Sequence, residues 1–342
     1  MPPLEINEIR ERQCNGRPGE ERKAIVKNTA LCAFGVWIVA AAVFAASRSA
    51  EDEQKSPRLP KIEPLFDYPL RDTCVCLGPD GIYYLTGTTG DTKTWWETND
   101  GGIRVWKSKD LKKWEALGPV WNFAKNTTWQ KGSTDEKGKL LRAIWAPEIH
   151  YFKNTFWIAY CVNYGGTGVL KSTSGKAEGP YIDMKPEGPL TPQIDASLFC
   201  DDDGKAYFVW QNGMIARLKD DMSGLAEEPR HLKPTNAEQV GFEGAFLTKI
   251  NGRYRLVCAE FNSHKDGPAT YDCMIAESDK LYGPYGDRYL AIPHGGHNML
   301  FKDKDGGWWS TFFGNDPKAP FTERPAILPL EFGDNGKIRP KL

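Results

Sequence analysis

The sequence has almost no excess of either charge. Its 342 residues carry 44 Lys and Arg against 45 Asp and Glu, which leaves a net charge of -1. Proteins that hold a polyanion such as nucleic acid usually present a strong positive field. The balance therefore disfavours nucleic acid as a partner, and a neutral or weakly charged ligand fits better.

Beyond residue 65 the sequence also lacks sustained helical periodicity, and no cysteine spacing is typical of a disulfide framework or a zinc site. Apolar residues keep helical spacing for no more than a turn or two, which argues against an α/β barrel. Six of the eight cysteines lie in this part of the chain, most of them in apolar, strand-like runs. Such thiols usually behave as small apolar side chains, so the sequence assigns no disulfide pairing.

The sequence is rich in aromatic and turn-forming residues. It contains 12 Trp, 13 Tyr, 34 Gly and 24 Pro. Aromatic side chains favour half-buried strands, while Gly and Pro favour tight turns. This combination predicts many short strands and an all-β fold.

The N-terminal part is expected to lie outside the globular fold. An apolar run at residues 30–46 follows a basic segment and precedes a charged one. This order is typical of an export signal, and the run is about as short as a membrane-spanning helix can be. We interpret residues 1–50 as a signal peptide or N-terminal membrane anchor rather than a buried helix, and residues 51–65 as a linker. The protein is therefore expected to be exported, periplasmic, extracellular or membrane-anchored, and to meet a membrane only through its N-terminal segment.

An aromatic, β-branched strand pattern recurs five times in the rest of the chain. Each copy follows a turn residue, and these residues are Gly81, Asn154, Gly204, Gly252 and Gly307. The copies are roughly fifty residues apart, except that the first interval is longer by about the size of an insertion. A period near fifty with several strands in each unit is typical of a propeller. We therefore predict a five-bladed β-propeller over residues 66–342.

Three acidic residues stand at a matched distance ahead of these turns. Asp72, Asp195 and Glu243 each precede the turn residue of their own repeat by nine positions. The innermost strand of each blade lines the central channel, so residues at the starts of inner strands converge on one axial pocket. A single buried Asp at such a place often only caps backbone amides. Three matched acids from different repeats favour a catalytic site.

Motifs around these acids resemble those of a known family. They are Arg71-Asp72, the segments 145–150 and 194–204, Glu243-Gly244-Ala245 and Gly295-Gly296-His297. In this order they resemble the family 43 glycoside hydrolases over nearly the whole chain beyond the linker. The resemblance implies a five-bladed propeller that hydrolyses O-glycosidic bonds with inversion. It also implies plant-type or algal-type polysaccharides as substrates, with arabinofuranosyl, xylosyl or galactosyl linkages.

The resemblance implies roles for individual side chains. Asp72 would be the general base, Glu243 the general acid, and Asp195 the residue that orients the acid and tunes its pKa. His297 resembles the family's channel histidine, which can hold a water or a calcium ion, and Arg324 resembles an arginine that approaches the substrate. No cofactor other than calcium is expected.

Aromatic residues near these motifs are open to two interpretations. Trp145 is a candidate substrate contact, although its motif suits packing between blades equally well, and Glu148 is left outside the catalytic set. Trp95 and Trp96 lie in the insertion of the first repeat. Exposed rings there would form a sugar-stacking platform, whereas buried rings would pack on the blade edge.

Glycoside hydrolysis requires two carboxyl groups in different protonation states. One donates a proton to the leaving oxygen, while the other takes a proton from water on the opposite face of the sugar. We expect burial and repulsion from Asp195 to keep Glu243 protonated, and Asp72, beside Arg71 and reachable by solvent, to stay ionised. Inversion requires the two groups to be roughly 6.5–9.5 Å apart, against about 5–5.5 Å for retention.

Two other functions remain open at this point. A retaining propeller glycosidase would need a fructan-type nucleophile motif or an arginine triad, and the sequence shows neither clearly. A carbohydrate-binding propeller without turnover would keep the pocket and lose the reaction. The sequence leaves the oligomeric state open.

Overall fold

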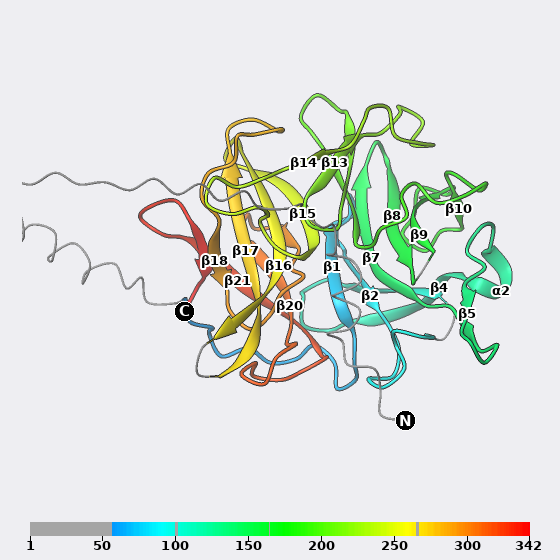
Figure 1. Ribbon diagram of the computed structural model, residues 1–342, viewed down its shortest axis with the longest axis horizontal. Coiled ribbons are helices and arrows are strands. Elements are labelled where there is room, and N and C mark those ends of the chain that lie inside the picture. The colour runs from blue at the N-terminus through cyan, green and yellow to red at the C-terminus, as the bar shows by residue number, and fades with distance from the viewer. Residues whose placement is uncertain (1–56, 100–101, 164, 265–266) are drawn as a thin grey trace, which may run out of the picture. The chain divides into compact units, whose positions relative to one another are not determined.

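The computed structural model describes residues 57–99, 102–163, 165–264 and 267–342 (Figure 1). The predicted export or anchor segment, residues 1–50, lies outside the described residues. Across the described ranges, no helix combines the length and the apolar character needed to cross a bilayer. The predicted linker is described from residue 57 onward, where the backbone is irregular and Leu59 and Ile62 pack against the core.

Five four-stranded antiparallel sheets confirm the predicted propeller. The first blade consists of β1 (Arg71–Leu77), β2 (Tyr83–Thr88), β3 (Gly102–Ser108) and β4 (Glu115–Asn122). The second consists of β7 (Ile144–Phe152), β8 (Thr155–Val162), β9 (Gly166–Ser172) and β10 (Tyr181–Asp183). The third consists of β11 (Ala196–Cys200), β12 (Ala206–Trp210), β13 (Met214–Arg217) and β14 (Arg230–His231).

The last two blades repeat the same order of strands. The fourth consists of β15 (Glu243–Ile250), β16 (Arg253–His264), β17 (Gly267–Ser278) and β18 (Tyr289–Ile292). The fifth consists of β19 (Leu300–Lys302), β20 (Trp308–Phe313), β21 (Pro325–Phe332) and β22 (Ile338–Pro340). In every blade the strands pair in chain order, so each sheet is a meander.

The first strand of each blade is the inner one. Contacts join β1 to β7, β7 to β11 and β11 to β15, and β1 also touches β19 and β20 of the last blade. In Figure 1, β1 lies in the middle of the ribbon between β7 and β16. Each of the five recurring turn residues lies in the turn that joins an inner strand to the second strand of its blade. The repeat seen in the sequence is therefore the inner hairpin of the blade.

The second strands carry much of the core. Every residue of β2, β8 and β12 is buried. Neighbouring blades pack face to face, so both faces of these strands are covered. This is why they appear in the sequence as short continuous apolar and aromatic runs rather than as an alternating pattern.

The long first interval of the repeat contains an insertion between β4 and β7. It holds the short helix α2 (Phe123–Asn126) and the small hairpin of β5 (Ser133–Thr134) and β6 (Leu140–Leu141). Asn122 caps α2, because its side chain accepts a hydrogen bond from the backbone of Lys125 at 3.0 Å. In Figure 1 the insertion lies at the edge of the ribbon, on the same side as β10.

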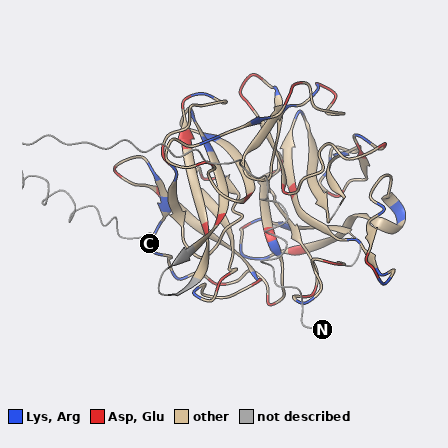
Figure 2. Ribbon diagram, viewed as in Figure 1, with Lys and Arg blue, Asp and Glu red and all other residues tan. Residues whose placement is uncertain are grey.

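Charged residues are mixed over the fold. Figure 2 shows basic and acidic positions interspersed along the ribbon, with no side of a single sign in this view. The mixture agrees with the near-zero net charge.

Candidate active site

Residues at the starts of the inner strands adopt a left-handed backbone, one in each blade. They are Asp72 (φ 50°), Ala146 (φ 42°), Asp195 (φ 56°), Gly244 (φ 64°) and His297 (φ 55°). In β1, β7 and β15 the pairing with the next strand shifts at this position, as in a β-bulge. A left-handed residue other than Gly costs about 1–2 kcal/mol, and such strain concentrates at functional sites. We call the end of the channel where these residues lie the upper face.

The nine-residue offset that drew attention to the three acids has two different origins. Asp72 and Asp195 occupy the left-handed position, whereas Glu243 stands one residue before it and Gly244 occupies it. The count is still nine because the turn after β15 has two residues, whereas the turns after β1 and β11 have five. A shorter turn thus compensates for the different place of Glu243 on its strand.

Asp72 is held by two neighbours. Thr88 Oγ1 donates a hydrogen bond to Asp72 Oδ2 at 2.7 Å and accepts one from the backbone N–H of Ala146, also at 2.7 Å. Asp72 Oδ1 lies 3.4 Å from Nδ1 of His297. Asp72 is only 8% exposed. The strands of neighbouring blades close around it, so only a small part of the residue remains reachable by solvent.

Glu243 receives a hydrogen bond from a residue that the sequence did not indicate. Tyr271 Oη donates to Glu243 Oε1 at 2.9 Å. Burial raises the pKa of Glu243 above its ordinary value, and the charge of Asp72 raises it further, although His297, Tyr271 and Arg71 oppose the increase. Burial also holds the pKa of Tyr271 well above its usual range, so the phenol keeps its proton and acts as a donor. The only feature that could have indicated Tyr271 is its position on β17, the third strand of the fourth blade, which pairs with β16.

Asp195 accepts a hydrogen bond from the backbone N–H of Gly244 at 3.0 Å. It thereby binds the residue that follows the proposed acid. Burial raises the pKa of Asp195 to about 7, with further increases from Glu243 and Asp72 and opposing effects from His297 and Gly244. We expected repulsion between Asp195 and Glu243, and the charge of Glu243 is among those that raise the pKa of Asp195.

His297 supplies positive charge to this group. The side chain is buried, which by itself lowers its pKa, but Asp72, Asp195, Glu243 and Glu148 together raise it above its ordinary value. The surroundings of His297 therefore suit a counter-charge for the carboxylates. A calcium ion at His297 stays a prediction.

Arg71, the neighbour of Asp72 in the sequence, directs its charge at another carboxylate. Its guanidinium forms an ion pair with Glu323. It also lies 4.1 Å from the ring centroid of Trp95 and 4.8 Å from that of Phe313. Arg71 thus closes one side of the site, held between two aromatic rings and a glutamate.

Arg324 and the adjacent Glu323 contact different residues. Its guanidinium lies 5.3 Å from the ring centroid of Phe321, whereas the adjacent Glu323 reaches Arg71. A contact between Arg324 and substrate stays a prediction.

Trp145 and the two tryptophans of the first insertion form one cluster. The indole N–H of Trp145 donates to the backbone oxygen of Trp95 at 3.2 Å, and the two rings meet edge to face at 5.9 Å. Trp96 is 38% exposed, while Arg71 covers one face of Trp95. Packing therefore accounts for Trp95, and Trp96 keeps the exposure that sugar stacking requires.

Glu148, which was left outside the catalytic set, is a fourth buried carboxylate. It lies 3.0 Å from Nε2 of His150. Its charge acts on His297 and on Cys74, whose pKa burial holds well above its usual range. Glu148 belongs to the electrostatic surroundings of the site and pairs with His150 rather than with the acids at the strand starts.

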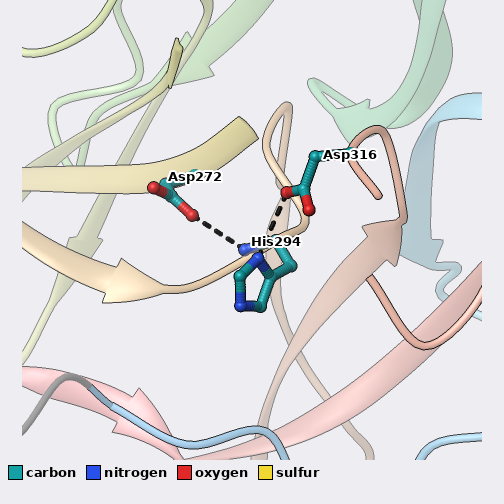
Figure 3. Close-up of side chains that lie close together, drawn as sticks. All are labelled: Asp272, His294 and Asp316. Atoms are coloured by element: carbon teal, nitrogen blue, oxygen red, sulfur yellow. Dashed lines mark hydrogen bonds and ion pairs between the residues drawn. The ribbon is translucent and has the colours of Figure 1, made fainter. Parts of the chain in front are cut away.

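A cluster of possible metal ligands includes His294, three residues before His297 (Figure 3). Asp272, His294 and Asp316 bring one ligand atom each within 4.8 Å of the others. Asp272 accepts from the backbone of His294 at 2.8 Å and also from Asn262 and Thr270. Asp316 accepts from the backbone of Tyr271 at 3.0 Å.

These bonds use all four carboxylate oxygens of the cluster, since Asp316 also accepts from Lys318. The cluster joins the loop that precedes His297 to the strand that carries Tyr271. A glycine completes the fit, because a Cβ at Gly296 would lie 2.6 Å from the Tyr271 ring. We therefore interpret the cluster as a clamp that positions His297 and Tyr271.

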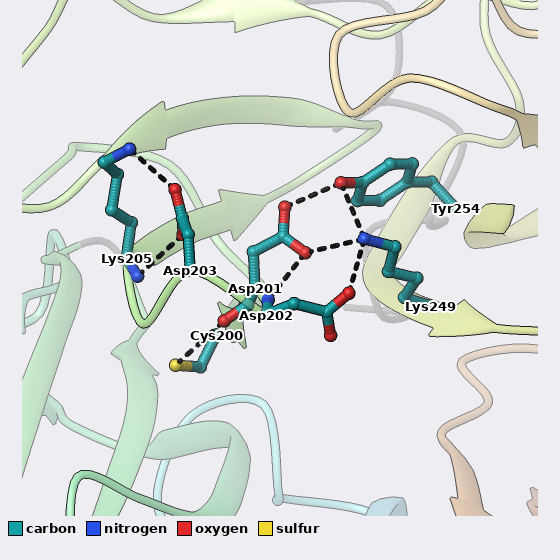
Figure 4. Close-up of polar contacts among 7 residues, drawn as sticks. All are labelled: Cys200, Asp201, Asp202, Asp203, Lys205, Lys249 and Tyr254. Carbon is teal, nitrogen blue, oxygen red and sulfur yellow. Dashed lines mark hydrogen bonds and ion pairs between the residues drawn. The ribbon is translucent and has the colours of Figure 1, made fainter. Parts of the chain in front are cut away.

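The acidic turn after β11 lies at the other end of the blades. Figure 4 shows Asp201 joined to Tyr254 and Lys249 of the fourth blade, with Tyr254 Oη to Asp201 Oδ2 at 2.6 Å. Lys205 pairs with Asp203 within the turn. Asp202 and Asp203 are exposed, as expected for a turn, but Asp201 links two blades.

Comparison with known proteins assigns the chain to a family. The model described as "Glycosyl hydrolases family 43" matches residues 63–338. The chain belongs to this family. It is 27% identical over 270 residues to "Xylosidase/arabinosidase 43B" of Humicola insolens, a match that covers 70% of this chain and 46% of that protein. It is 29% identical over 225 residues to "Beta-D-galactofuranosidase xynD" of Aspergillus niger, covering 58% and 61%.

Solved structures agree with the fold. An endo-1,4-beta-xylanase from Bacteroides thetaiotaomicron matches with a TM-score of 0.61 and 25% identity, over 82% of this chain and 97% of that one. An alpha-L-arabinofuranosidase from Clostridium thermocellum matches with a TM-score of 0.60 and 23% identity, over 79% and 94%. The chain spans about half the length of the first curated relatives it matches.

Proposed function

We propose that this chain hydrolyses O-glycosidic bonds by an inverting acid–base mechanism. The substrates would be xylosyl, arabinofuranosyl or galactosyl linkages of plant-type or algal-type polysaccharides. The observation that carries the proposal is a group of three carboxylates from three blades: Asp72 lies 3.4 Å from the buried His297, Asp195 accepts from Gly244, and Glu243 accepts from Tyr271. Family membership and the names of the relatives support the reaction and the range of sugars.

Glu243 is the proton donor. Burial raises its pKa, so the carboxyl group holds a proton closer to neutral pH than an exposed glutamate would. It protonates the leaving oxygen as the glycosidic bond breaks. The Tyr271 hydroxyl then stabilises the carboxylate that forms, because a hydrogen bond to a charged group is stronger than one to a neutral group.

Asp72 is the general base. It takes a proton from the attacking water on the face of the sugar opposite to Glu243. Thr88 donates to one carboxylate oxygen and Ala146 holds Thr88 in turn, so the second oxygen is directed at the site. His297 beside that second oxygen stabilises the negative charge of the group.

Asp195 is a positioning residue. Its bond to the backbone of Gly244 sets the direction of the strand start from which Glu243 projects. Burial raises the pKa values of both Asp195 and Glu243. The two carboxylates also repel each other, so the protonation of one affects the pKa of the other.

The test is hydrolysis of p-nitrophenyl β-D-xyloside, α-L-arabinofuranoside and β-D-galactoside, with the anomeric form of the product of a natural oligosaccharide followed by NMR. We expect release from at least one substrate, with inversion, and a loss of about 10²–10⁴-fold in kcat on the natural oligosaccharide for Asp72→Asn and Glu243→Gln. Sugar binding with no release from any of them would support a non-catalytic propeller instead. A product that keeps its anomeric configuration would support a retaining enzyme.

We also propose that residues 1–50 export the chain or anchor it in a membrane. The apolar run at residues 30–46, with its basic flank, supports this. Cell fractionation with N-terminal sequencing of the product tests it, and recovery of the uncleaved chain in the cytoplasmic fraction would refute it.

A further inference from the structure

A groove on the upper face lies apart from the carboxylates. It has a volume of about 470 Å³, and its two walls are the insertion segment Thr128–Gly132 and the segment Pro186–Pro189. Val162 and Gly165, at the end of β8, form its floor. Val162 pairs with Ile144 at the start of the inner strand β7. The groove therefore opens at the same end of the second blade as the catalytic group.

A continuous set of contacts joins the groove to the site. Asn163, next to Val162, donates from its side chain to the backbone oxygen of Trp96 at 2.8 Å and accepts from Ala143 at 2.8 Å. Trp96 adjoins Trp95, which stacks on Arg71 beside the proposed base. The path from the base to the groove thus runs along exposed and half-buried tryptophans.

The two walls are held together by one carboxylate. Asp183, at the end of β10, accepts from Thr128 Oγ1 at 3.0 Å and from the side chain of Gln130. Both donors belong to the insertion, whereas Asp183 leads directly into the opposite wall. A groove whose walls are fixed before binding loses less conformational freedom when a ligand enters.

The lining has the chemistry of a sugar site. Trp129 contributes its ring, one face of which stacks on Tyr160 with 6.0 Å between centroids and 19° between planes. The Trp129 indole N–H is buried and has no acceptor among the described residues, so Trp129, which lines the groove, would contact a ligand through its ring. Lys131 and Glu187 are exposed at the rim with opposite charges. The groove therefore suits a neutral ligand rich in hydroxyl groups rather than a polyanion.

We propose that this Trp129 groove binds a further sugar unit of the same glycan chain whose bond is cleaved at Asp72 and Glu243. The proposal rests on the proposed function and narrows it, because it makes oligosaccharides and polysaccharides better substrates than single-sugar glycosides.

The experiment compares long and short substrates. We would measure kcat/KM on xylo-oligosaccharides and arabino-oligosaccharides of increasing length and on the matching p-nitrophenyl monoglycosides. In Trp129→Ala the gain with chain length should fall roughly tenfold, equal to the loss of one good contact, while the rate on the monoglycoside stays unchanged.

A second variant protects the test against misfolding, since Trp129 also packs on Tyr160. Replacing Lys131 and Glu187 together by alanine alters only exposed rim side chains, and it should reduce the gain with chain length in the same direction. The matched control replaces Asp203 and Lys205 by alanine, an exposed pair of opposite charge on the turn after β11, and should leave both rates unchanged. Equal losses on long and short substrates, or no loss in either groove variant, would overturn the proposal.

Calorimetric titration of the Glu243→Gln protein with a xylo- or arabino-hexasaccharide separates the two claims. Hydrolysis by the wild type without any effect of Trp129 on hexasaccharide binding would refute the groove and keep the proposed function. Absence of hydrolysis together with Trp129-dependent binding would refute the proposed function and keep the groove.

Discussion

The hydrogen bond from Tyr271 to Glu243 offers a direct test of the proton donor. In Tyr271→Phe the ring stays and keeps its packing against Phe261 and Phe313, whose ring centroids lie 4.5 and 6.0 Å from that of Tyr271. Only the hydroxyl that donates to Glu243 Oε1 at 2.9 Å is lost. A hydrogen bond to a charged group contributes about 1.5–3 kcal/mol, and this one is shielded from water because Tyr271 is 1% exposed.

The sign of the effect follows from which form the bond stabilises. A phenol O–H donates to the ionised carboxylate, so it lowers the pKa of Glu243 against the larger effect of burial, which raises it. Removing the donor raises the pKa further. A general acid must be protonated, so activity is lost as pH rises through its pKa. The basic limb of the kcat/KM profile should therefore move to higher pH in Tyr271→Phe. On substrates with poor leaving groups kcat should also fall, because the negative charge that forms on Glu243 as it gives up its proton is less stabilised.

The assay is the full pH–rate profile of both proteins on an oligosaccharide and on an aryl glycoside whose leaving group needs little protonation. Tyr254→Phe is the matched control, because it removes a tyrosine–carboxylate hydrogen bond to Asp201 away from the upper face. The control should keep the wild-type profile. A basic limb that stays in place or moves to lower pH in Tyr271→Phe would contradict the assignment of Glu243 as the acid.

Three further outcomes are expected. Gly244→Ala should lower the melting temperature and kcat, because a left-handed alanine costs about 1–2 kcal/mol and its Cβ would lie 2.9 Å from the His297 ring; Gly252→Ala, also left-handed but with open space around it, should keep kcat. Thr88→Val should reduce kcat and stability by leaving a buried backbone N–H unpaired, a cost of about 1–3 kcal/mol, and Thr88→Ser should restore both; equal kcat in the Val and Ser variants would argue against a role in holding the base. For Asp201, burial raises the pKa, but hydrogen bonds from Tyr254, the Asp202 backbone and Lys249 outweigh burial and lower it. The ionised form therefore stabilises the fold above the unfolded-state pKa of Asp201, and this stabilisation is lost as pH falls through the folded-state pKa. Asp201→Asn should therefore unfold about 1 kcal/mol more easily at neutral pH and match the wild type in acid by thermal denaturation, with kcat/KM unchanged at both.

The number of blades and the positions of the three candidate acids at inner-strand starts could be predicted because both are local features. The turn residues and the buried aromatic strands after them repeat five times, and each repeat is one inner hairpin. The acids precede those hairpins at a constant count, although the structure shows that Glu243 reaches that count through a shorter turn. A pattern that recurs along the chain needs no knowledge of long-range contacts.

Other features depend on contacts between strands that are distant in the sequence, within one blade or between blades. Tyr271 and Glu243 are 28 positions apart, and Arg71 and Glu323 are 252 positions apart, so no local spacing predicts either contact. The same reason explains why the sequence could not show that the charge of Arg71 is directed at Glu323 or how deeply Asp72 is buried.

The sequence alone determined the number of blades, the all-β class and the family, and it singled out the three acids as candidates, since these depend on composition, period and short motifs. Only the tertiary structure decided which donors hold those acids, that His297 stands among them as a counter-charge, and that the first insertion forms a groove with the outer edge of the second blade. Closing the ring of blades places side chains from distant repeats within hydrogen-bonding distance, and burial among like charges then raises the pKa values of Asp195 and Glu243.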